Sequence, residues 1–268
     1  MVSKAVLEVS CAGLEVFESN RYDAAIVDLD GTMVNTLGDF VAAINLMLEE
    51  LRPPGFAGRA LTASDVGRWV GKGSEHLVES VLLEAFSQSG RTPSATDLIA
   101  IYAPAFASYQ KHYAAVNGHH STLYPGVLQG LNRLKKSGLK LACLTNKPIA
   151  FALPLLRSKG LESFFLEVFG GDSFERKKPD PLPLLKTCEA LHSQPARTLM
   201  IGDSSNDARA ARAAGCPVLL VTYGYNHGEP VRAADADGFV DSLAAIELAG
   251  IKTATGLSPP WSIGAQRL

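Results

Sequence analysis

The stretch Ala24-Ala25-Ile26-Val27-Asp28-Leu29-Asp30-Gly31-Thr32 is a short apolar run that ends in two carboxylates. The run is typical of a buried strand, and the Gly-Thr pair predicts its end. Because side chains alternate along a strand, we expect Asp28 and Asp30 to leave its carboxyl end on the same side. Two carboxylates so close repel each other, and burying either one unpaired costs free energy. The pair therefore indicates a divalent cation; the alternative is an Asp-rich turn that closes a hairpin.

The composition is that of an ordinary globular protein, with 47% hydrophobic residues among 268 and a formal net charge of −2. This length accommodates one large domain or two smaller ones. The charge provides no broad basic surface for nucleic acid or an anionic membrane, and no apolar run approaches the length of a membrane span. Glu8, Glu15 and Glu18 interrupt the first segment, which argues against a signal peptide. The four cysteines form no CxxC pair, so we expect a reduced, cytoplasmic setting.

The pattern of apolar residues changes along the chain. Residues 37–51 place them at helical spacing, and up to about residue 120 the chain predicts helices and loops without a convincing strand. From residue 124 onward, short apolar runs alternate with helical segments. The predicted helices are 37–51, 65–70, 74–86, 96–116, 127–136, 151–159, 181–191 and 208–214, and the predicted strands after the first are 139–144, 168–169, 198–201, 218–222 and 239–240.

This alternation predicts the fold class and the domain organisation. Buried strands that alternate with helices are typical of an α/β fold with a doubly wound parallel sheet. The helical block then forms a separate lobe, inserted just after the first strand. We expect an N-terminal extension at 1–20, an α/β core at 21–35 and 121–250, an all-helical cap at 36–120, and a loosely held tail at 251–268.

Polar residues gather where the predicted strands end. In open parallel sheets, ligands bind beyond the carboxyl ends of the strands. Those ends and the loops beside them carry Asp28, Asp30, Thr145, Asn146, Lys178, Asp203 and Asp207. Each residue alone is more typical of a turn or a surface, but together they offer carboxylates for a metal, a hydroxyl and an amide for an anion, and a cation. A phosphoryl group with Mg²⁺ requires such a set.

Four motifs in this order resemble those of the haloacid dehalogenase (HAD) superfamily. They are Asp28-Leu29-Asp30-Gly31-Thr32, Thr145 after a strand, Lys177-Lys178-Pro179-Asp180-Pro181, and Gly202-Asp203-Ser204-Ser205-Asn206-Asp207. The resemblance covers residues 22–245 and implies a Rossmann-like core with an inserted helical cap. Within the superfamily the chain is most similar to the bacterial phosphoglycolate phosphatases, through Trp69-Val70-Gly71-Lys72-Gly73, Leu144-Thr145-Asn146-Lys147-Pro148, Gly170-Gly171-Asp172 and Thr222-Tyr223-Gly224-Tyr225-Asn226.

Two residues depart from the pattern of this family. Asn35 stands where relatives usually have Asp, and Val27 stands where many have Phe. Neither is expected to touch the reacting groups, but Asn35 bears on the hinge between the two lobes.

The resemblance also implies a role for each motif residue. Asp28 would attack phosphorus and form an aspartyl-phosphate, and Asp30 would protonate the leaving oxygen and then deprotonate the hydrolytic water. Mg²⁺ would be held by the Asp28 carboxylate, the Asp30 main-chain carbonyl and Asp203, with Asp207 near its waters. The remaining substrate-binding candidates are Thr145, Asn146 and Lys178 for the phosphoryl oxygens, Thr32, and Lys72 for a second anionic group. For Lys72 an ordinary turn that links two helices is an equal alternative.

The carboxylic acid at position 30 restricts the activities that the resemblance implies. Haloacid dehalogenases and phosphonatases resemble this framework but lack an acid at that position, so Asp30 favours phosphatases and phosphomutases. The leading hypothesis is a Mg²⁺-dependent phosphatase that acts on a small phosphorylated metabolite, most of all 2-phosphoglycolate, as a monomer or homodimer without nucleic acid or membrane. The alternatives are a phosphosugar phosphatase (for a sugar phosphate or an amino-sugar acid phosphate) and a phosphomutase. A non-catalytic binding protein would have lost its nucleophile or a metal ligand, and this chain retains them.

Overall fold

The computed structural model describes residues 15–18, 22–53, 58–88, 90, 92 and 94–249. Most of the predicted N-terminal extension, and the whole predicted tail at 251–268, lie outside the described residues. The strands are β1 (Glu15–Glu18), β2 (Ala24–Val27), β3 (Val34–Asn35), β4 (Thr122–Leu123), β5 (Lys140–Leu144), β6 (Glu167–Phe169), β7 (Thr198–Gly202), β8 (Val218–Val221), β9 (Gly238–Val240) and β10 (Ile246–Ala249). The α-helices are α1 (Leu37–Leu51), α2 (Ala63–Gly67), α3 (Ser74–Gln88), α4 (Ala95–Val116), α5 (Val127–Lys136), α6 (Ile149–Ser158), α7 (Leu182–Ala190) and α8 (Ser205–Ala214).

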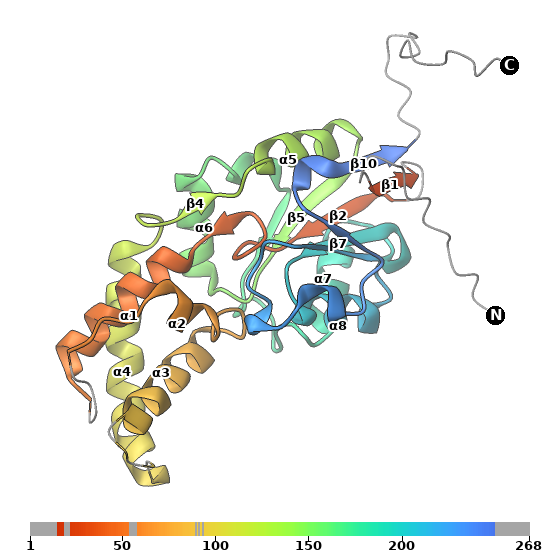
Figure 1. The fold of residues 1–268 in the computed structure, drawn as a ribbon. Coiled ribbons are helices and arrows are strands. Elements are labelled where there is room, and N and C mark those ends of the chain that lie inside the picture. Colours follow the sequence, from red (N-terminus) through yellow and green to blue (C-terminus); the bar gives the residue numbers. More distant parts are fainter. Residues whose placement is uncertain are drawn as a thin grey trace, which may run out of the picture.

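A six-stranded parallel sheet in the order β6-β5-β2-β7-β8-β9 forms the core, which confirms the predicted fold class (Figure 1). Strand β2 lies in the middle, and all four of its residues are buried. Ala25 and Val27 pack with α5 and α6 on one face, whereas Ala24 and Ile26 pack with α7 and α8 on the other. Because both faces are covered, the strands of this sheet are mostly apolar instead of alternating between apolar and polar residues.

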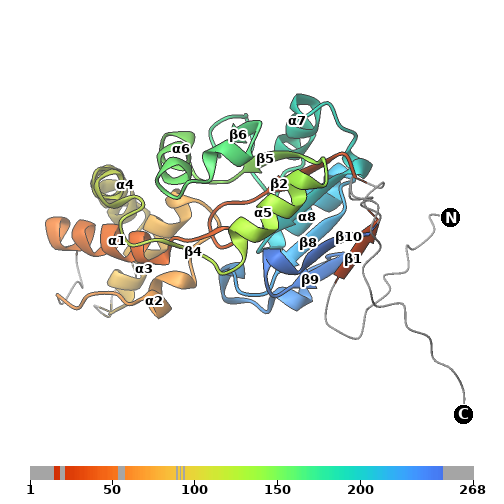
Figure 2. The same ribbon diagram turned by 90° about the horizontal axis from the view of Figure 1, so that it is seen from above.

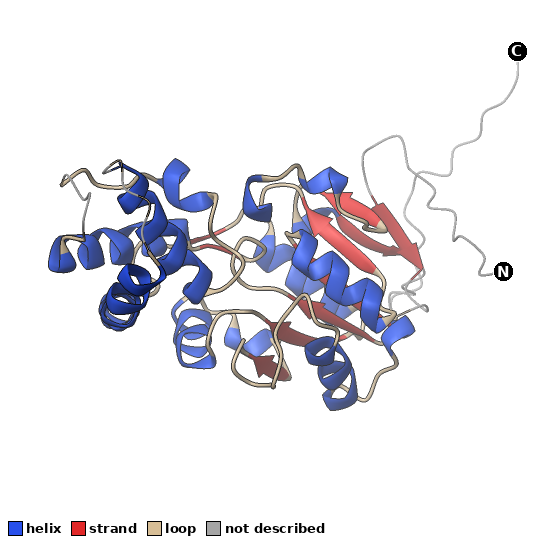
Figure 3. Ribbon diagram, turned by 90° about the horizontal axis from the view of Figure 1, so that it is seen from below, coloured by secondary structure: helices blue, strands red, loops and turns tan. Residues whose placement is uncertain are grey.

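Helices α1 to α4 form a second lobe at one end of the sheet, as the view from above shows (Figure 2). The view from below, coloured by secondary structure, shows helices joined by loops in this lobe and a sheet between helices in the other lobe (Figure 3). The helical lobe has its own apolar cluster, built around Ile44, Met47 and Leu82 with Tyr109 and Tyr113. None of the described residues between 36 and 120 forms a strand, as the sequence predicts.

Two short strands join the lobes. In the antiparallel pair β3–β4, Val34 is opposite Leu123 and Asn35 is opposite Thr122. The chain therefore enters and leaves the helical lobe at neighbouring positions. A second small sheet pairs β1 with β10 in parallel. The sequence analysis predicts neither pair, since strands of two to four residues are set by their distant partners and not by a local pattern.

Helices α2 and α8 begin two and three residues earlier than their apolar periodicity predicts, and side-chain contacts at their first turns explain both. Helix α2 begins at Ala63 because Thr62 and Asp65 form a capping box, in which each side chain accepts from the backbone N–H of the other residue. Helix α8 begins at Ser205, where the Asp207 carboxylate accepts from the backbone N–H and the hydroxyl of Ser204. In α8 this contact has a further consequence, since it fixes a carboxylate at the carboxyl edge of the sheet.

Candidate active site

Most of the predicted site residues line a pocket between the two lobes, beyond the carboxyl ends of β2, β5 and β7. The pocket has an empty volume of about 660 Å³, part of it open to solvent. Its polar lining comes mainly from the core, namely Asp28, Asp30, Thr145, Asn146, Lys147, Lys178, Asp203, Ser204, Asn206 and Asp207. Its apolar lining comes mainly from the helical lobe, including Phe40, Leu77, Tyr109 and Tyr113, with Phe151 from the core.

The turn after β2 positions the first two carboxylates. The amides of Met33 and Val34 both donate to the carbonyl of Leu29 at 3.0 Å, so the chain reverses directly after the strand. Gly31 has a φ of +84°, and a Cβ at this position would collide with the Asp203 carboxylate. Glycine is therefore required here both by the backbone conformation and by the close approach of a second acid.

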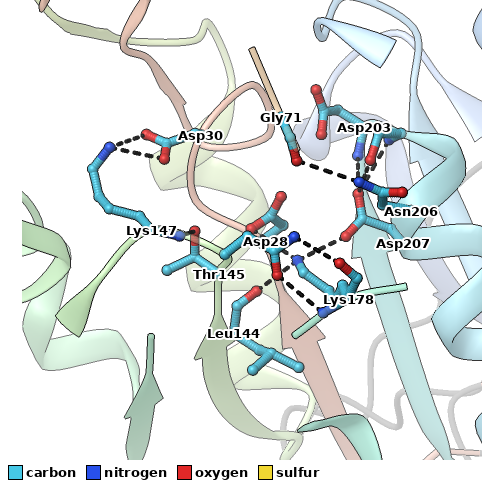
Figure 4. Close-up of polar contacts among 12 residues, drawn as sticks. Asp28, Asp30, Gly71, Leu144, Thr145, Lys147, Lys178, Asp203, Asn206 and Asp207 are labelled. Carbon is cyan, nitrogen blue, oxygen red and sulfur yellow. Dashed lines mark hydrogen bonds and ion pairs between the residues drawn. The ribbon is translucent and has the colours of Figure 1, made fainter. Parts of the chain in front are cut away.

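Lys178 is the buried cation that joins the motifs. Its Nζ lies 3.0 Å from Asp28 Oδ1 and 2.7 Å from Asp207 Oδ1, and it donates to the Leu144 carbonyl at 2.9 Å (Figure 4). Burial alone would lower the pKa of Lys178, but the Asp207 and Asp28 carboxylates outweigh it and raise the pKa. Asn146 holds the Lys178 backbone, because its side-chain oxygen accepts from the Lys178 amide at 3.0 Å and its amide group donates to the Lys178 carbonyl at 2.8 Å.

Asp28, Asp203 and Asp207 form a buried acidic cluster in which one carboxylate oxygen from each lies within 4.8 Å of the others. Asp207 Oδ2 accepts from the backbone amides of Asp203 and Ser204, whereas Asp203 Oδ2 accepts from the Tyr225 amide at 2.7 Å. Burial raises the pKa of Asp28 to about 7, in spite of Lys178. Burial and the Asp207 charge raise the pKa of Asp203 well above its usual range. Three carboxylates with one lysine leave excess negative charge, so the cluster fits a divalent cation with oxygen ligands.

The carboxylate of Asp30 lies outside this cluster. Its two oxygens accept from Lys147 Nζ at 3.0 and 2.9 Å, and Figure 4 shows this pair on the opposite side of Asp28 from Asp203. Lys147 is 6% exposed, with its Nζ 4.7 Å from the ring centroid of Phe40 and 4.9 Å from that of Tyr113. Lys147 is not among the predicted site residues, although it follows Thr145 and Asn146 directly in the sequence.

The other predicted substrate-binding residues differ in their placement. Thr145 is buried and lines the pocket, and its hydroxyl accepts from the Lys147 amide at 3.2 Å. Thr32 is buried, its hydroxyl has no hydrogen-bond partner among the described residues, and it does not belong to the pocket lining. Lys72 is exposed and also stands apart from the lining, although its neighbours Gly71 and Gly73 belong to it. The structure thus brings Thr145 to the other motif residues but does not bring Lys72 or Thr32 to the pocket.

Tyr225 connects the acidic cluster with the hinge between the lobes. Its amide donates to Asp203, while its hydroxyl accepts from the Thr36 amide at 2.8 Å and donates to the Asn35 side-chain oxygen at 3.2 Å. Asn35 also accepts from the Leu37 amide at 3.3 Å, so this residue lies in the hinge, as expected. A carbonyl oxygen at position 35 provides both acceptor contacts without adding a negative charge beside the acidic cluster.

The parallel core, the inserted helical lobe and the ordered motifs at the strand ends define a hydrolase of the HAD type. The family model for haloacid dehalogenase-like hydrolases matches residues 22–215, and the chain belongs to this family. No helix among the described residues is long and apolar enough to span a membrane.

Individual relatives show which kind of HAD hydrolase the chain resembles. The phosphoglycolate phosphatase of Thiobacillus denitrificans is 44% identical over 82% of this chain and 92% of the relative. The plasmid-encoded phosphoglycolate phosphatase of Cupriavidus necator is 42% identical over 83% of this chain and 90% of the relative. Among solved structures, a predicted phosphoglycolate phosphatase from Haemophilus somnus 129pt has a TM-score of 0.75 and 32% identity, over 84% of this chain and 96% of that one.

Proposed function

We propose that the protein is a Mg²⁺-dependent phosphatase that hydrolyses 2-phosphoglycolate to glycolate and phosphate through an aspartyl-phosphate on Asp28. The observation that carries this proposal is the convergence of Asp28, Lys178 and the acidic cluster at the carboxyl end of the central strand. The names of the most similar relatives support the choice of substrate. The positions of α1 to α4 support the proposed cap boundaries at 36–120, since all four helices lie within them.

Asp28 and Asp30 divide the chemistry between them. An oxygen of the Asp28 carboxylate attacks phosphorus, the bond from phosphorus to the glycolate oxygen breaks, and Asp30 gives that oxygen its proton. Asp30 then accepts a proton from a water molecule, which attacks the phosphorus of the aspartyl-phosphate and releases phosphate. The separate surroundings of the two acids suit these roles: Asp28 lies against Lys178, and Asp30 lies against Lys147 at the edge of the cap.

The remaining residues hold the phosphoryl group and its charge. Lys178, Thr145 and Asn146 line the pocket beside Asp28, and we assign them to the phosphoryl oxygens. Asp28, Asp203 and the Asp30 carbonyl, with Asp207 nearby, would hold Mg²⁺. When bound, this ion supplies positive charge that offsets the repulsion between the nucleophilic carboxylate and the phosphate. Phe40 and Tyr113 add apolar walls to the pocket on the side of the cap.

Phosphate release from a panel of phosphorylated metabolites tests the proposal. The panel contains 2-phosphoglycolate, glucose 6-phosphate, an amino-sugar acid phosphate and p-nitrophenyl phosphate, each with Mg²⁺, with Ca²⁺ and with excess EDTA. We expect the highest kcat/KM with 2-phosphoglycolate and Mg²⁺, poor activity with Ca²⁺ because its coordination is larger and looser, and none in EDTA. Preference for a sugar phosphate would contradict the assigned substrate, and full turnover in EDTA would contradict the metal assignment.

A further inference from the structure

The pocket holds two buried lysines, and their surroundings differ. Lys178 Nζ donates to Asp207 and to the Leu144 carbonyl and forms an ion pair with Asp28, so it lies within the acidic cluster. Lys147 Nζ donates to the two oxygens of Asp30, its oxygen partners among the described residues, and the rings of Phe40 and Tyr113 flank it. Lys147 thus retains one donor without an oxygen partner among the described residues, which gives it capacity for a further anion away from the acidic cluster.

The charges of the pocket point to the same residue. Four carboxylates (Asp28, Asp30, Asp203 and Asp207) and two ammonium groups line it, a formal excess of two negative charges. A divalent cation beside Asp28 balances this excess, so a cation that contacts a second anionic group of the substrate must be one of the two lysines of the lining. The phosphate binds on the side of the pocket where Lys178 lies, so the carboxylate of the substrate needs a cation elsewhere in the pocket. Lys147 is the remaining cation of the lining, because Lys72 is exposed and lies outside it.

The environment of Lys147 strengthens its attraction for an anion. Its side chain is 3% exposed, and aromatic faces replace water around the ammonium. A charge in such surroundings is screened less than one at the surface, and the aromatic rings stabilise the cation while they leave it free to contact an anion. Tyr113 adds a buried hydroxyl that has no hydrogen-bond partner among the described residues.

We propose that Lys147 binds the carboxylate of the substrate and sets the preference of the enzyme for acidic phosphomonoesters. This inference rests on the proposed phosphatase function and identifies the residue that selects the substrate class. Lys147 comes from the core, directly after β5, whereas Phe40 and Tyr113 come from α1 and α4. The carboxylate therefore binds where the two lobes meet, and its contact with Lys147 requires the aromatic walls of the cap to be in place.

Three two-carbon phosphomonoesters test the inference: 2-phosphoglycolate, ethyl phosphate and 2-aminoethyl phosphate. The methyl carbon of ethyl phosphate takes the place of the carboxylate carbon, and the ammonium nitrogen of 2-aminoethyl phosphate takes the place of a carboxylate oxygen. We expect the wild-type kcat/KM to be highest for 2-phosphoglycolate, lower for ethyl phosphate and lowest for 2-aminoethyl phosphate. Lys147→Met should lower the ratio of kcat/KM for 2-phosphoglycolate to that for ethyl phosphate by about 10- to 150-fold, the size of a lost hydrogen bond to a charged group.

Two more variants make the comparison specific. Lys147→Gln keeps a donor for Asp30 but removes the charge, so it should lower the same ratio even where Lys147→Met unfolds. Any loss that comes from misplacing Asp30 affects both substrates and cancels in the ratio. Lys72→Met is the matched control, an exposed lysine beside the pocket, and its ratio should stay within about 2-fold of wild type, less than the loss of any charged hydrogen bond.

The outcomes separate this inference from the proposed function. An unchanged ratio in Lys147→Gln, or a loss confined to Lys72→Met, would overturn the role of Lys147 and move the carboxylate site to the loop around Gly71 and Gly73. A wild-type enzyme that hydrolyses all three esters equally well would also overturn it, while leaving the phosphatase function intact. Failure to release phosphate from any of the three would instead contradict the proposed function itself.

Discussion

At the scale of single residues, Asp28 can be replaced to test catalysis without loss of stability, because its carboxylate is buried in a cluster of like charges. Its carboxylate carries a raised pKa because it is buried beside Asp207 and Asp30, with Lys178 as its cation. Asp28→Asn preserves the shape of the side chain and removes one charge from a repulsive cluster. We therefore expect Asp28→Asn to keep the thermal stability of the wild type but to form no phosphoenzyme. Mass spectrometry of rapidly quenched reactions checks this, and phosphate trapped on any other residue would contradict the assigned nucleophile.

Asp30 is expected to act in proton transfer, so its loss should slow turnover without preventing substrate binding. Asp30→Asn keeps an oxygen that accepts from Lys147 but cannot exchange a proton. We expect kcat to fall by about 10²- to 10⁴-fold, the usual contribution of a general acid or base. Asp180→Asn is the control, because Asp180 pairs with Arg176 and does not line the pocket. A loss in Asp30→Asn no larger than in this control would assign proton transfer to another group.

Lys178 holds the site together by charge as well as by contact. Lys178→Met leaves Asp28 and Asp207 buried without their shared cation, and such a loss costs about 3–5 kcal/mol of the free energy of unfolding. Its neighbour Lys177 pairs with Glu75 at the surface, so Lys177→Met should change stability by no more than about 1 kcal/mol. Urea unfolding of both variants measures the difference. Mg²⁺ should restore part of the loss in Lys178→Met; equal stability of the two variants would be inconsistent with a central role for Lys178.

At the scale of elements, the turn after β2 depends on glycine for two separable reasons. Gly31 and Gly138 have φ of +84° and +83°, so alanine strains both backbones alike, by about 1–2 kcal/mol. Only at Gly31 would the new Cβ collide with Asp203, because nothing lies within 4 Å of a Cβ at Gly138. We expect Gly31→Ala to lose more stability than Gly138→Ala, and only Gly31→Ala to lose Mg²⁺-dependent activity. Equal activity of the two would show that the turn tolerates displacement of Asp203.

The elements also show which parts of the fold a sequence can predict. The bounds of α1 and α5 agree with their predicted ranges, since apolar periodicity and a stop signal act locally. The pairs β3–β4 and β1–β10 escape prediction because their strands are defined by partners far away in the chain. The same reason hides the contact between Asp30 and Lys147, which are 117 positions apart. Motifs therefore indicate which residues gather at the strand ends, whereas the pairing of Asp30 with Lys147 emerges only from tertiary packing.

At the scale of the whole molecule, the two lobes have separate apolar clusters and meet at the pocket. The connection is narrow, since Asn35 and Thr122 are partners across the β3–β4 ladder. Contacts cross between the lobes at several points: Phe151 and Tyr225 of the core pack against the helical cluster, Asn206 donates to the Gly71 carbonyl at 3.3 Å, and Lys177 pairs with Glu75. Because each lobe has its own apolar cluster, we expect the core to fold without the cap.

A variant that replaces residues 36–121 by Asn-Gly tests this division. Partners in an antiparallel ladder lie about 4.5–5.5 Å apart, a gap that a two-residue turn closes. We expect cooperative unfolding and residual Mg²⁺-dependent hydrolysis, but a ratio of activities on 2-phosphoglycolate and ethyl phosphate as low as in Lys147→Met. The reason is that Lys147 loses Phe40 and Tyr113 and becomes solvated, so that water screens its charge. A core that fails to unfold cooperatively would contradict its independence, and an undiminished ratio would mean that recognition of the carboxylate does not need the cap.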